Sequence, residues 1–258
     1  MLEGLDTLVV GGGGGGIGRA ITRAFAAAGS AVAVADVDPR RAEEAAAEVA
    51  ASGGRAVALT ADVRSRTEVD GLVERAVAEL GALDVLVTVV GGQLAFVPAA
   101  PIHETTDEDW ELMLDLNLRY VFHAVRAALR TFLAQGRGGT IVSVGSITGI
   151  AGSAGQAAYG AAKAGLASLA RSVAAEYSRD GIRMNVVAAG PIATPVARAA
   201  QALGSADWIP AGRNGSPEEV GQAAMFLASP VSSYVSGQTL VLDGGATAVG
   251  PFPPGRLG

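Results

Sequence analysis

A tyrosine and a lysine four residues apart could perform acid–base chemistry. Tyr159 and Lys163 lie in the segment Tyr-Gly-Ala-Ala-Lys, and Ser146 precedes Tyr159 by 13 residues. Residues four apart share one face of a helix, and a cation beside a phenol lowers the phenol's pKa from about 10 toward neutral pH. Tyr159 could then act as a general acid or base, with the Ser146 hydroxyl stabilising charge on a substrate oxygen. The same pair also occurs on ordinary surface helices, so the surrounding sequence must decide whether this pair is catalytic.

The composition is that of a globular protein and argues against two classes of partner. Half of the 258 residues are hydrophobic, and the net charge of −6 argues against nucleic acid or an anionic membrane surface as partner. The absence of cysteine excludes disulfides and thiol chemistry. With only His103 and His123 present, we expect no metal site. The first residues do not resemble a signal peptide, and no apolar run approaches the roughly 18 residues of a membrane helix. We therefore expect a soluble, cytoplasmic protein.

Short apolar segments alternate with longer alanine-rich, amphipathic segments. Strands are predicted near residues 6–10, 31–35, 55–60, 84–90, 139–144, 183–188 and 238–242, and helices near 17–28, 39–52, 66–80, 107–134, 157–179 and 217–228. Continuous apolar strands are typical of a parallel sheet buried on both faces. The alternation predicts an α/β fold: a single-domain, Rossmann-type, doubly wound parallel sheet of about seven strands with helices on both faces, spanning residues 1–250. Residues 251–258 are predicted to form an extended C-terminal tail, because prolines recur there.

A run of six glycines, Gly11 to Gly16, separates the first predicted strand from the first predicted helix, which opens with Ile17 and Gly18. One interpretation is a low-complexity segment without structure. The position between strand and helix favours nucleotide binding instead, because glycines there allow a tight turn and let a pyrophosphate approach the N–H groups of the helix. The helix dipole adds positive potential. The sequence therefore predicts a dinucleotide site.

Asp36 ends the second predicted strand, 18 residues after Gly18. An acidic residue near this spacing hydrogen-bonds the ribose 2′-hydroxyl of a bound dinucleotide. The alternative is that Asp36 caps the next helix, but Asp38 followed by Pro39 suits that task better. A carboxylate at the ribose would repel a 2′-phosphate. We therefore expect NAD rather than NADP as the cofactor.

Taken together, these motifs resemble the short-chain dehydrogenase/reductase family over essentially the whole chain. The resemblance is carried by seven ordered features: Gly12-x-x-x-Gly16-Ile17-Gly18, Asp62-Val63, Asn117, Ser146 with Tyr159 and Lys163, Gly190-Pro191-Ile192-Ala193-Thr194, Arg213-x-Gly215-x-Pro217-Glu218-Glu219-Val220, and Gly237-Gln238-x-Leu240-x-Leu242-Asp243-Gly244-Gly245. It implies hydride transfer between NAD(H) and a secondary alcohol or ketone.

The resemblance also implies the role of each site residue. Tyr159 exchanges the hydroxyl proton, Lys163 lowers the pKa of Tyr159 and holds the nicotinamide ribose, and Ser146 hydrogen-bonds the substrate oxygen. Asn117 anchors a proton-relay water; its alternative is a local bond to the helix backbone. The implied cofactor contacts are Gly12, Gly16, Ile17, Gly18, Asp36, Asp62, Val63, Gly91, Tyr159, Lys163, Pro191, Ile192 and Thr194. A homotetramer is implied, with an interface built from the small-residue helix 157–179 and from residues 107–134; packing on the chain's own sheet is the alternative.

Three segments depart from the family's pattern. The usual threonine is Gly11 and the loop interior is all glycine, so we expect a loop that is mobile without cofactor. Thr88-Val89-Val90-Gly91 replaces Asn-Asn-Ala-Gly, which removes the side-chain amides that hold the turn; we expect the two valines to extend the strand and the Thr88 hydroxyl to replace one bond. Ala189-Gly190 stands where Pro-Gly is usual.

The substrate pocket is expected at the C-terminal ends of the strands. Its candidate walls are mostly apolar: Gln93, Leu94, Phe96, Ile147, Ala151, Gln156, Pro191 and residues 196–209. They suit an apolar ketone or secondary alcohol such as a steroid, terpenoid or acyl chain, with Gln93 and Gln156 as polar contacts. Residues 195–210 are alanine-rich and short of helix caps, so a mobile lid is expected there. A 3-oxoacyl-carrier-protein reductase, which would usually favour NADPH, and a catalytically silent nucleotide-binding regulator stay open as alternatives.

Overall fold

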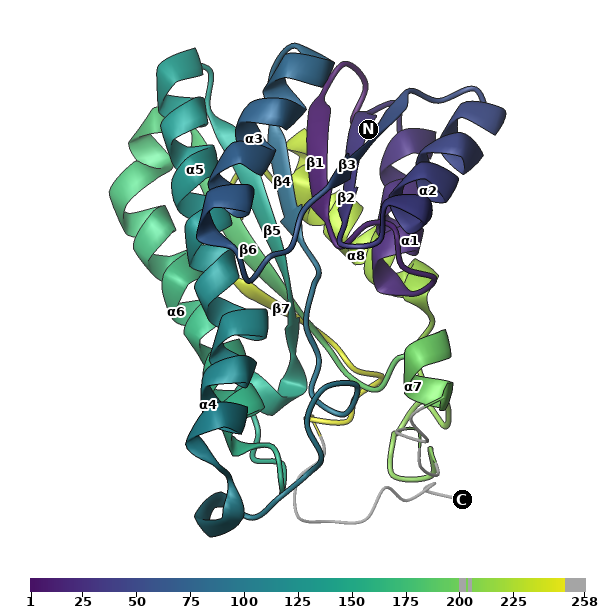
Figure 1. The fold of residues 1–258 in the computed structure, drawn as a ribbon, viewed down its shortest axis with the longest axis vertical. Helices are drawn as coiled ribbons and strands as arrows, with labels where there is room; N and C mark the ends of the chain where they lie inside the picture. The colour runs from purple at the N-terminus through teal and green to yellow at the C-terminus, as the bar shows by residue number, and fades with distance from the viewer. Residues whose placement is uncertain (200–202, 204–205, 249–258) are drawn as a thin grey trace.

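Seven parallel strands form one sheet in a computed structural model that describes residues 1–199, 203 and 206–248 (Figure 1). The predicted tail, residues 251–258, lies outside the described residues. The strands occur in the spatial order β3-β2-β1-β4-β5-β6-β7. Their bounds are β1 Asp6–Val10, β2 Ala31–Asp36, β3 Ala56–Thr60, β4 Val85–Thr88, β5 Gly139–Ser146, β6 Ile182–Ala189 and β7 Thr239–Leu242. The predicted doubly wound α/β sheet is therefore confirmed.

Helices cover both faces of the sheet (Figure 1). One face carries α3 (Arg66–Leu80), α5 (Tyr120–Gln135) and α6 (Ala157–Tyr177), and the other carries α1 (Ile17–Ala27), α2 (Pro39–Ala51) and α8 (Pro217–Ala228). Successive strand residues point to opposite faces. Leu8 and Val10 accordingly belong to the core under α3 and α5, whereas Val9 belongs to the core under α1 and α8. This is why most strand residues are apolar on both faces of the sheet.

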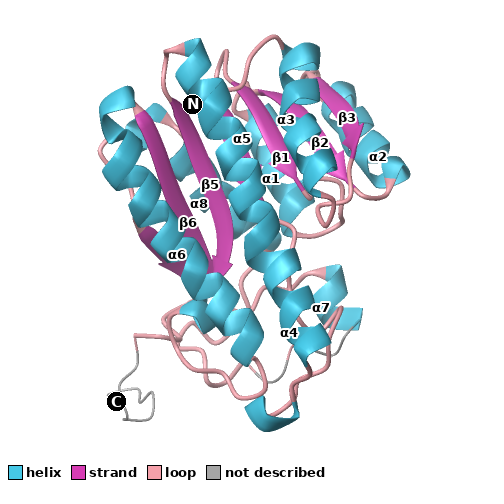
Figure 2. Ribbon diagram, turned by 60° about the vertical axis from the view of Figure 1, so that its left-hand side comes forward, coloured by secondary structure: helices cyan, strands magenta, loops and turns pink. Residues whose placement is uncertain are grey.

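The chain reverses its direction of winding between β1 and β4, which are neighbours in the sheet. At such a switch point, the loops after the strands diverge and leave a crevice outside their carboxyl ends. Figure 2 shows α4 (Asp107–Leu114), α7 (Pro195–Ala199) and their connecting loops beyond this end of the strands. The topology therefore brings together the segments after β1, β4, β5 and β6.

Helices α1 and α8 pack closely on one face of the sheet although they come from opposite ends of the sequence. A Cβ at Gly221 would lie 3.1 Å from the carbonyl oxygen of Ala20, so the two helix backbones approach within a distance that favours glycine. Ile21 and Phe25 of α1 are fully buried in the core that they share with Val220 and Leu227 of α8. The second helical layer therefore depends on both ends of the chain.

Two helix starts follow the capping chemistry of their sequences. Asp38 accepts a hydrogen bond from the N–H group of Arg40 at the start of α2, with Pro39 in the first helical position. At the start of α8, Ser216 and Glu219 form a capping box. The expected capping role of Asp38 is thus confirmed.

The single helix predicted over residues 107–134 is wrong. The structure has α4, a π-helical turn over Asp115–Arg119, and then α5. Within this turn the N–H group of Tyr120 bonds to the carbonyl of Asp115, five residues earlier, and the side-chain Nδ2 of Asn117 donates to the carbonyl of Met113 at 3.0 Å. The bond from the Asn117 side chain to the backbone lies at this interruption of the helix. The spacing of apolar residues in the sequence cannot reveal such a bond.

The expected extension of the fourth strand through Val89 and Val90 is also wrong, because β4 ends at Thr88. Gly91 and Gly92 have φ values of +147° and +128°, which turn the chain away from the sheet. The Tyr120 hydroxyl donates to the carbonyl of Val90 at 2.8 Å. The Thr88 hydroxyl donates to Ser143 on β5 at 2.8 Å and also interacts with the Tyr120 hydroxyl.

Residues 195–210 contain a helix that the sequence did not predict, α7. Thr194 supplies the cap that was thought absent, since its Oγ1 accepts a hydrogen bond from the N–H group of Ala197 at 3.0 Å. Residues 200–202 and 204–205 lie outside the described residues, and the mobility of this segment stays a prediction. No helix among the described residues has the length and apolar character needed to cross a membrane.

Candidate active site

A cleft of about 740 Å³ opens at the carboxyl ends of the central strands. It receives residues from the loops that follow β1, β4, β5 and β6 and from helices α6 and α7. Of the predicted site residues, those that line it are Gly16, Ile17, Gly18, Gly91, Ser146, Tyr159, Lys163, Pro191, Ile192 and Thr194. Gly12, Asp36, Asp62, Val63 and Asn117 are not part of this lining. The structure therefore gathers most of the predicted site in one cleft and places the remainder around it.

Helix α6 and the end of β5 bring three predicted catalytic residues together. Lys163 is 5% exposed, and its Nζ donates to the carbonyl of Val144 at 3.0 Å. The same Nζ lies 5.6 Å from the centre of the half-buried Tyr159 ring. Ser146 Oγ accepts hydrogen bonds from the N–H group and the hydroxyl of Thr148, at 3.2 and 2.9 Å. With two bonds accepted, the Ser146 hydroxyl keeps its own proton for donation.

Burial changes the ionisation of the Tyr159–Lys163 pair. It lowers the pKa of Lys163 from 10.5 to about 8. It also raises the pKa of Tyr159 above 10, against the opposing effect of the Ser146 hydroxyl. The predicted lowering of the Tyr159 pKa by Lys163 is therefore wrong for the protein without cofactor, because the loss of hydration outweighs the hydrogen bond with Ser146. Lys163 is also the only lysine in the sequence, a signal that the motif analysis missed.

Asn117 is fully buried behind the cleft, in the π-helical turn. Its Oδ1 accepts from the N–H group of Gly92 at 2.9 Å, and its Nδ2 donates to the carbonyls of Gly92 and Met113 at 3.1 and 3.0 Å. A Cβ at Gly91 would lie 2.4 Å from Asn117 Oδ1 and 3.1 Å from Lys163 Nζ. Asn117 thus makes the local helix bond considered as its alternative and also ties the Gly91–Gly92 turn, in place of the missing side-chain amides.

The glycines of the β1–α1 loop fall into two kinds. Gly12 and Gly18 are required by packing, since a Cβ would lie 2.8 Å from Thr22 Oγ1 in the first case and 1.9 Å from the carbonyl oxygen of Gly11 in the second. Gly14 and Gly15 line the cleft and face open space: a Cβ at Gly14 would meet nothing within 4 Å. The loop therefore keeps a backbone-lined hollow in front of α1.

Helix α1 begins behind this hollow, with Gly16 as its N-cap and no side-chain cap hydrogen bond. Its first N–H groups therefore lack a side-chain acceptor, and such a helix start is suited to a phosphate. The hollow and the open helix start together fit the pyrophosphate of a dinucleotide. Of the predicted contacts in this region, Gly16, Ile17 and Gly18 lie at the hollow, whereas Gly12 is buried beneath it.

The two acidic residues assigned to the adenosine half already have partners. One oxygen of Asp36 accepts a hydrogen bond from the N–H group of Asp38 at 3.1 Å, while the capping of α2 is carried out by Asp38. Asp62 pairs with Arg64 at 2.6 Å, and this contact holds the pKa of the Asp62 carboxyl below its usual range. Val63 is buried beside it at 8% exposure. Arg41 lines the cofactor end of the cleft, and sequence reasoning missed it.

Apolar side chains from the segments after β4 and β6 line another part of the cleft, which we call its apolar end. Leu94, Val196 and Trp208 line it and are 40%, 59% and 49% exposed, respectively. Gln93, which was expected to be a polar substrate contact, lines the cleft; its Nε2 donates to the carbonyl of Gly155 at 2.8 Å, and its buried Oε1 has no partner among the described residues. Gln156 lines the cleft from the N-cap of α6. This end therefore presents mainly apolar surface.

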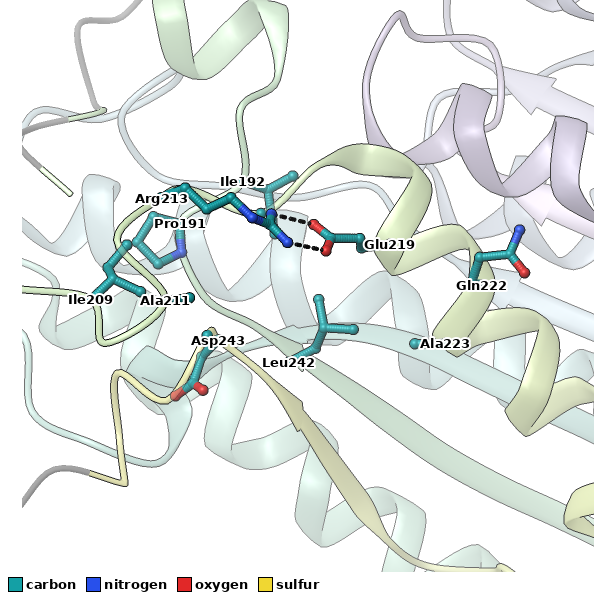
Figure 3. Close-up of a pocket in the computed structure, with 12 residues that line it drawn as sticks. Pro191, Ile192, Ile209, Ala211, Arg213, Glu219, Gln222, Ala223, Leu242 and Asp243 are labelled. Atoms are coloured by element: carbon teal, nitrogen blue, oxygen red, sulfur yellow. Dashed lines mark hydrogen bonds and ion pairs between the residues drawn. The ribbon is translucent and has the colours of Figure 1, made fainter.

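A second, smaller cleft of about 470 Å³ lies behind the Pro191–Ile192 segment and contains none of the predicted catalytic residues (Figure 3). Arg213 and Glu219 form a two-bond ion pair at its edge, with N–O distances of 2.7 and 2.9 Å (Figure 3). This pair lowers the pKa of Glu219 to about 2. Since Glu219 also caps α8, the Arg213–Val220 signature serves to fasten the start of this helix.

Comparison with known proteins agrees with this geometry. The sequence model of a family described as "Enoyl-(Acyl carrier protein) reductase" matches residues 12–247. A 3beta-hydroxysteroid dehydrogenase 2 from Eggerthella lenta is 33% identical over 250 residues, covering 94% of this chain and 95% of that protein. A cis-4-hydroxycyclohexanecarboxylate dehydrogenase from Sinomonas cyclohexanicum is 41% identical over 244 residues, covering 93% and 96%.

Solved structures agree equally well. A 7 alpha-hydroxysteroid dehydrogenase complexed with NADH and 7-oxo glycochenodeoxycholic acid superposes with a TM-score of 0.86 at 30% identity, covering 95% of this chain and 94% of that chain. A short-chain type dehydrogenase/reductase from Mycobacterium marinum gives a TM-score of 0.87 at 34% identity, covering 96% and 97%. The match extends over nearly the full length of both partners in each case. The chain therefore belongs to the short-chain dehydrogenase/reductase family.

Proposed function

We propose that this protein is an NAD-dependent dehydrogenase that acts on apolar secondary alcohols and the corresponding ketones. One observation carries the proposal: a single cleft holds the Ser146–Tyr159–Lys163 set at its centre and a glycine-lined helix start at one end. The relatives whose names specify an activity are dehydrogenases of hydroxylated compounds. Residues 1–250 would form one catalytic domain.

Proton transfer in this proposal belongs to Tyr159. Because burial raises its pKa, Tyr159 carries its proton at neutral pH and can donate it to a carbonyl oxygen during reduction. In the reverse direction it accepts the proton of the substrate hydroxyl. The Ser146 hydroxyl donates to the same substrate oxygen, a contact typically worth about 3–4 kcal/mol of the barrier. The nicotinamide, when bound, supplies or accepts the hydride.

Lys163 and Asn117 do not exchange the substrate proton themselves but support its transfer by Tyr159. Lys163 is assigned to the nicotinamide ribose. Asn117 holds the Gly91–Gly92 turn in contact with Lys163, which places it where it can anchor a relay water. The rest of the cofactor is assigned to contacts around the cleft: Gly12, Gly16, Ile17 and Gly18 at the pyrophosphate, Asp36 at the ribose, Asp62 and Val63 at the adenine, and Gly91, Pro191, Ile192 and Thr194 at the nicotinamide.

We assign NAD rather than NADP on the position of Asp36 at the end of β2. Its carboxylate would accept a hydrogen bond from the ribose 2′-hydroxyl and repel a 2′-phosphate. The test is a comparison of kcat/KM for the two cofactors with one alcohol. A higher value for NAD is expected, and a clear preference for NADP would refute the role of Asp36.

The substrate class follows from the apolar end of the cleft. Leu94, Val196 and Trp208 offer hydrophobic surface, and among the described residues the cationic side chains that line the cleft are Arg41, beside the glycine loop, and Lys163. A carboxylate would find no cation at the apolar end. We therefore propose neutral, ring-containing alcohols, such as steroids or alicyclic alcohols. A screen of alcohols that follows NADH absorbance should find activity, and failure of every alcohol would favour the silent nucleotide-binding regulator.

The description of the matching family model gives a reason to retain an acyl-carrier-protein reductase as second candidate. Such an enzyme would reduce a 3-oxoacyl thioester, which the Ser146–Tyr159–Lys163 set could also serve. Assaying acetoacetyl-coenzyme A with NADH and NADPH separates the candidates. Rapid thioester reduction that depends on NADPH would favour the reductase over the alcohol dehydrogenase.

We further propose a homotetramer and a cytoplasmic location. Large apolar side chains are exposed on the predicted interface, including Trp110, Phe122 and Leu133 on α4 and α5 at 38%, 45% and 47%. At one end of the sheet, β7 exposes Leu240 and Val241 at 36% and 40%. Isolated exposed apolar residues are common, but such groups mark interaction surfaces. Sedimentation at micromolar concentration should give a tetramer, and a monomer would refute this proposal.

A further inference from the structure

Arg19, in the first turn of α1, holds the glycine loop from its inner side. The residue is 8% exposed, and its Nε and Nη2 both donate to the carbonyl oxygen of Gly13, at 3.1 and 2.7 Å. Hydrogen bonds from a charged donor are roughly twice as strong as neutral ones. The carbonyl of Gly13 is therefore fixed toward Arg19.

The same guanidinium also reaches α2. Its Nη1 donates to Glu48 Oε1 at 2.8 Å, and its Nη2 to the carbonyl of Arg41 at 3.4 Å. Arg19 thus connects the loop, α1 and α2 through one rigid planar group. Truncating it would leave the Gly13 carbonyl without this partner.

The bond to Gly13 also determines where the next N–H group points. The peptide unit is planar, and no cis peptide bond occurs among the described residues, so the N–H group of Gly14 points opposite to the Gly13 carbonyl. Gly14 lines the cleft, and the space around its missing side chain is open. Arg19 therefore turns an unhindered N–H donor away from the protein body.

We propose that Arg19 is a positioning residue for the dinucleotide: it keeps the glycine loop in the conformation that receives the pyrophosphate before the cofactor arrives. The inference rests on the proposed function. Successive glycines carry a large backbone entropy, and a loop that is already restrained loses less entropy when it binds a ligand. The restraint by Arg19 opposes the mobility that the glycine composition alone predicts.

Arg23 offers a matched control on the same helix. It binds the same Glu48, through Nε at 3.0 Å and Nη2 at 2.8 Å, but its side chain is 59% exposed and no bond joins it to the described glycine loop. The full-length Arg19→Ala and Arg23→Ala variants therefore both remove a partner of Glu48. Only the first removes the restraint on Gly13.

Three measurements test the proposal: NADH affinity by fluorescence titration, the KM and kcat for NAD, and hydrogen exchange of residues 11–16 in the cofactor-free protein. Arg19→Ala should weaken NADH binding about 10- to 100-fold, as expected for losing hydrogen bonds from a charged group. It should raise the KM for NAD with kcat little changed, and accelerate exchange in the loop. Arg19→Lys, with the charge but not the fork, should recover part of the affinity, and Arg23→Ala should match the wild type.

Two results would overturn the proposal. One is loop exchange in Arg19→Ala equal to that of the wild type; the other is an NADH affinity equal to that of Arg23→Ala, even if the variant unfolds at a lower temperature. If the wild type binds no NADH, the proposed function fails, while exchange in the cofactor-free loop still reports separately on the restraint. If Arg19→Ala does not fold, all three measurements are made on Arg19→Lys. The same two results, observed in that variant, would refute the proposal.

Discussion

The two ends of the cleft are held together by different forces. At the cofactor end, glycine backbone, a buried guanidinium and the Asn117 amide fix the geometry through hydrogen bonds and contacts that exclude a Cβ. At the substrate end, half-exposed apolar side chains such as Trp208 provide surface with little directional bonding. Hydrogen bonds depend steeply on geometry, whereas apolar burial depends mainly on area. Substitutions should therefore have large, position-specific effects at the first end and small, graded effects at the second.

The largest effect is expected at the junction of the two ends, where Tyr159→Phe removes the proton donor. Turnover should fall by about 10²- to 10⁴-fold, the usual contribution of a general acid or base. NADH binding should stay near the wild-type value, because the ring remains in place. Both are measured by NADH absorbance and fluorescence. Tyr234→Phe, at a fully exposed tyrosine, is the control; near-normal turnover in Tyr159→Phe would contradict the mechanism.

Within the cofactor end, the two kinds of glycine should respond oppositely to alanine. Gly18→Ala places a Cβ 1.9 Å from the Gly11 carbonyl oxygen and should lower the free energy of unfolding by more than about 3 kcal/mol. Gly14→Ala meets open space and, if anything, should raise it by up to about 1 kcal/mol. Chemical denaturation of the cofactor-free proteins measures both.

The same pair of variants separates folding from binding. Gly14→Ala should weaken NADH binding although it does not lower the free energy of unfolding, because the Cβ enters the space assigned to the pyrophosphate. An unaltered NADH affinity in Gly14→Ala would mean that the hollow is not the pyrophosphate site.

Lys163 should make stability depend on pH. Its pKa is lowered by burial from 10.5 to about 8, so between these pH values the unfolded chain holds a proton that the folded protein releases. The free energy of unfolding should therefore rise with pH across this window, by up to about 3 kcal/mol relative to Lys163→Met. Below pH 8 the cost of burying the charge is fully present.

The lone lysine allows a direct measurement of this titration. With one lysine in the sequence, a lysine-specific NMR label reports on Lys163 alone. A midpoint near pH 8 in the cofactor-free protein is expected. A midpoint above pH 10 would show that the amine is well hydrated and that the cofactor end is less tightly packed than the structure indicates.

The smallest effect is expected at the substrate end. Trp208→Ala removes apolar surface that is already about half exposed, so the KM for an apolar alcohol should rise by roughly 3- to 10-fold. The KM for NAD should be unchanged. Steady-state kinetics with both substrates varied measures this. A loss as large as that of Tyr159→Phe would break the contrast between the two ends.

The sequence allowed most of the fold to be predicted, because the strands are mainly apolar on both faces and the helices are amphipathic or alanine-rich. Two errors, the unbroken helix over 107–134 and the long fourth strand, share one physical cause. Asn117 and Tyr120 bond to backbone groups that lie 25 and 30 residues away from them in the sequence, and local propensity cannot predict such bonds. Helix α7 was missed for a related reason, since a single Thr194 hydroxyl caps it.

The sequence predicted which residues belong to the candidate site better than it predicted their pKa values. Spacing placed Ser146, Tyr159 and Lys163 in one cleft, because helical and strand geometry determine which residues meet. The pKa of Tyr159 was predicted in the wrong direction, since burial is a property of the folded chain. The role of Arg19 was not predicted, because its partner is a backbone carbonyl. Every residue type has this group, so the sequence does not mark it.

The packing of α1 against α8 has a consequence for synthesis of the chain. About 200 residues separate the two helices, so at about 5–20 residues per second roughly 10–40 s pass between their appearance. Throughout that interval, the face of α1 that carries Ile21 and Phe25 has no α8 to cover it. Ribosome-bound chains that end before residue 217 should therefore be cleaved by protease near α1, and released full-length chains should resist. The C-terminal end of this enzyme completes a layer that its N-terminal end begins.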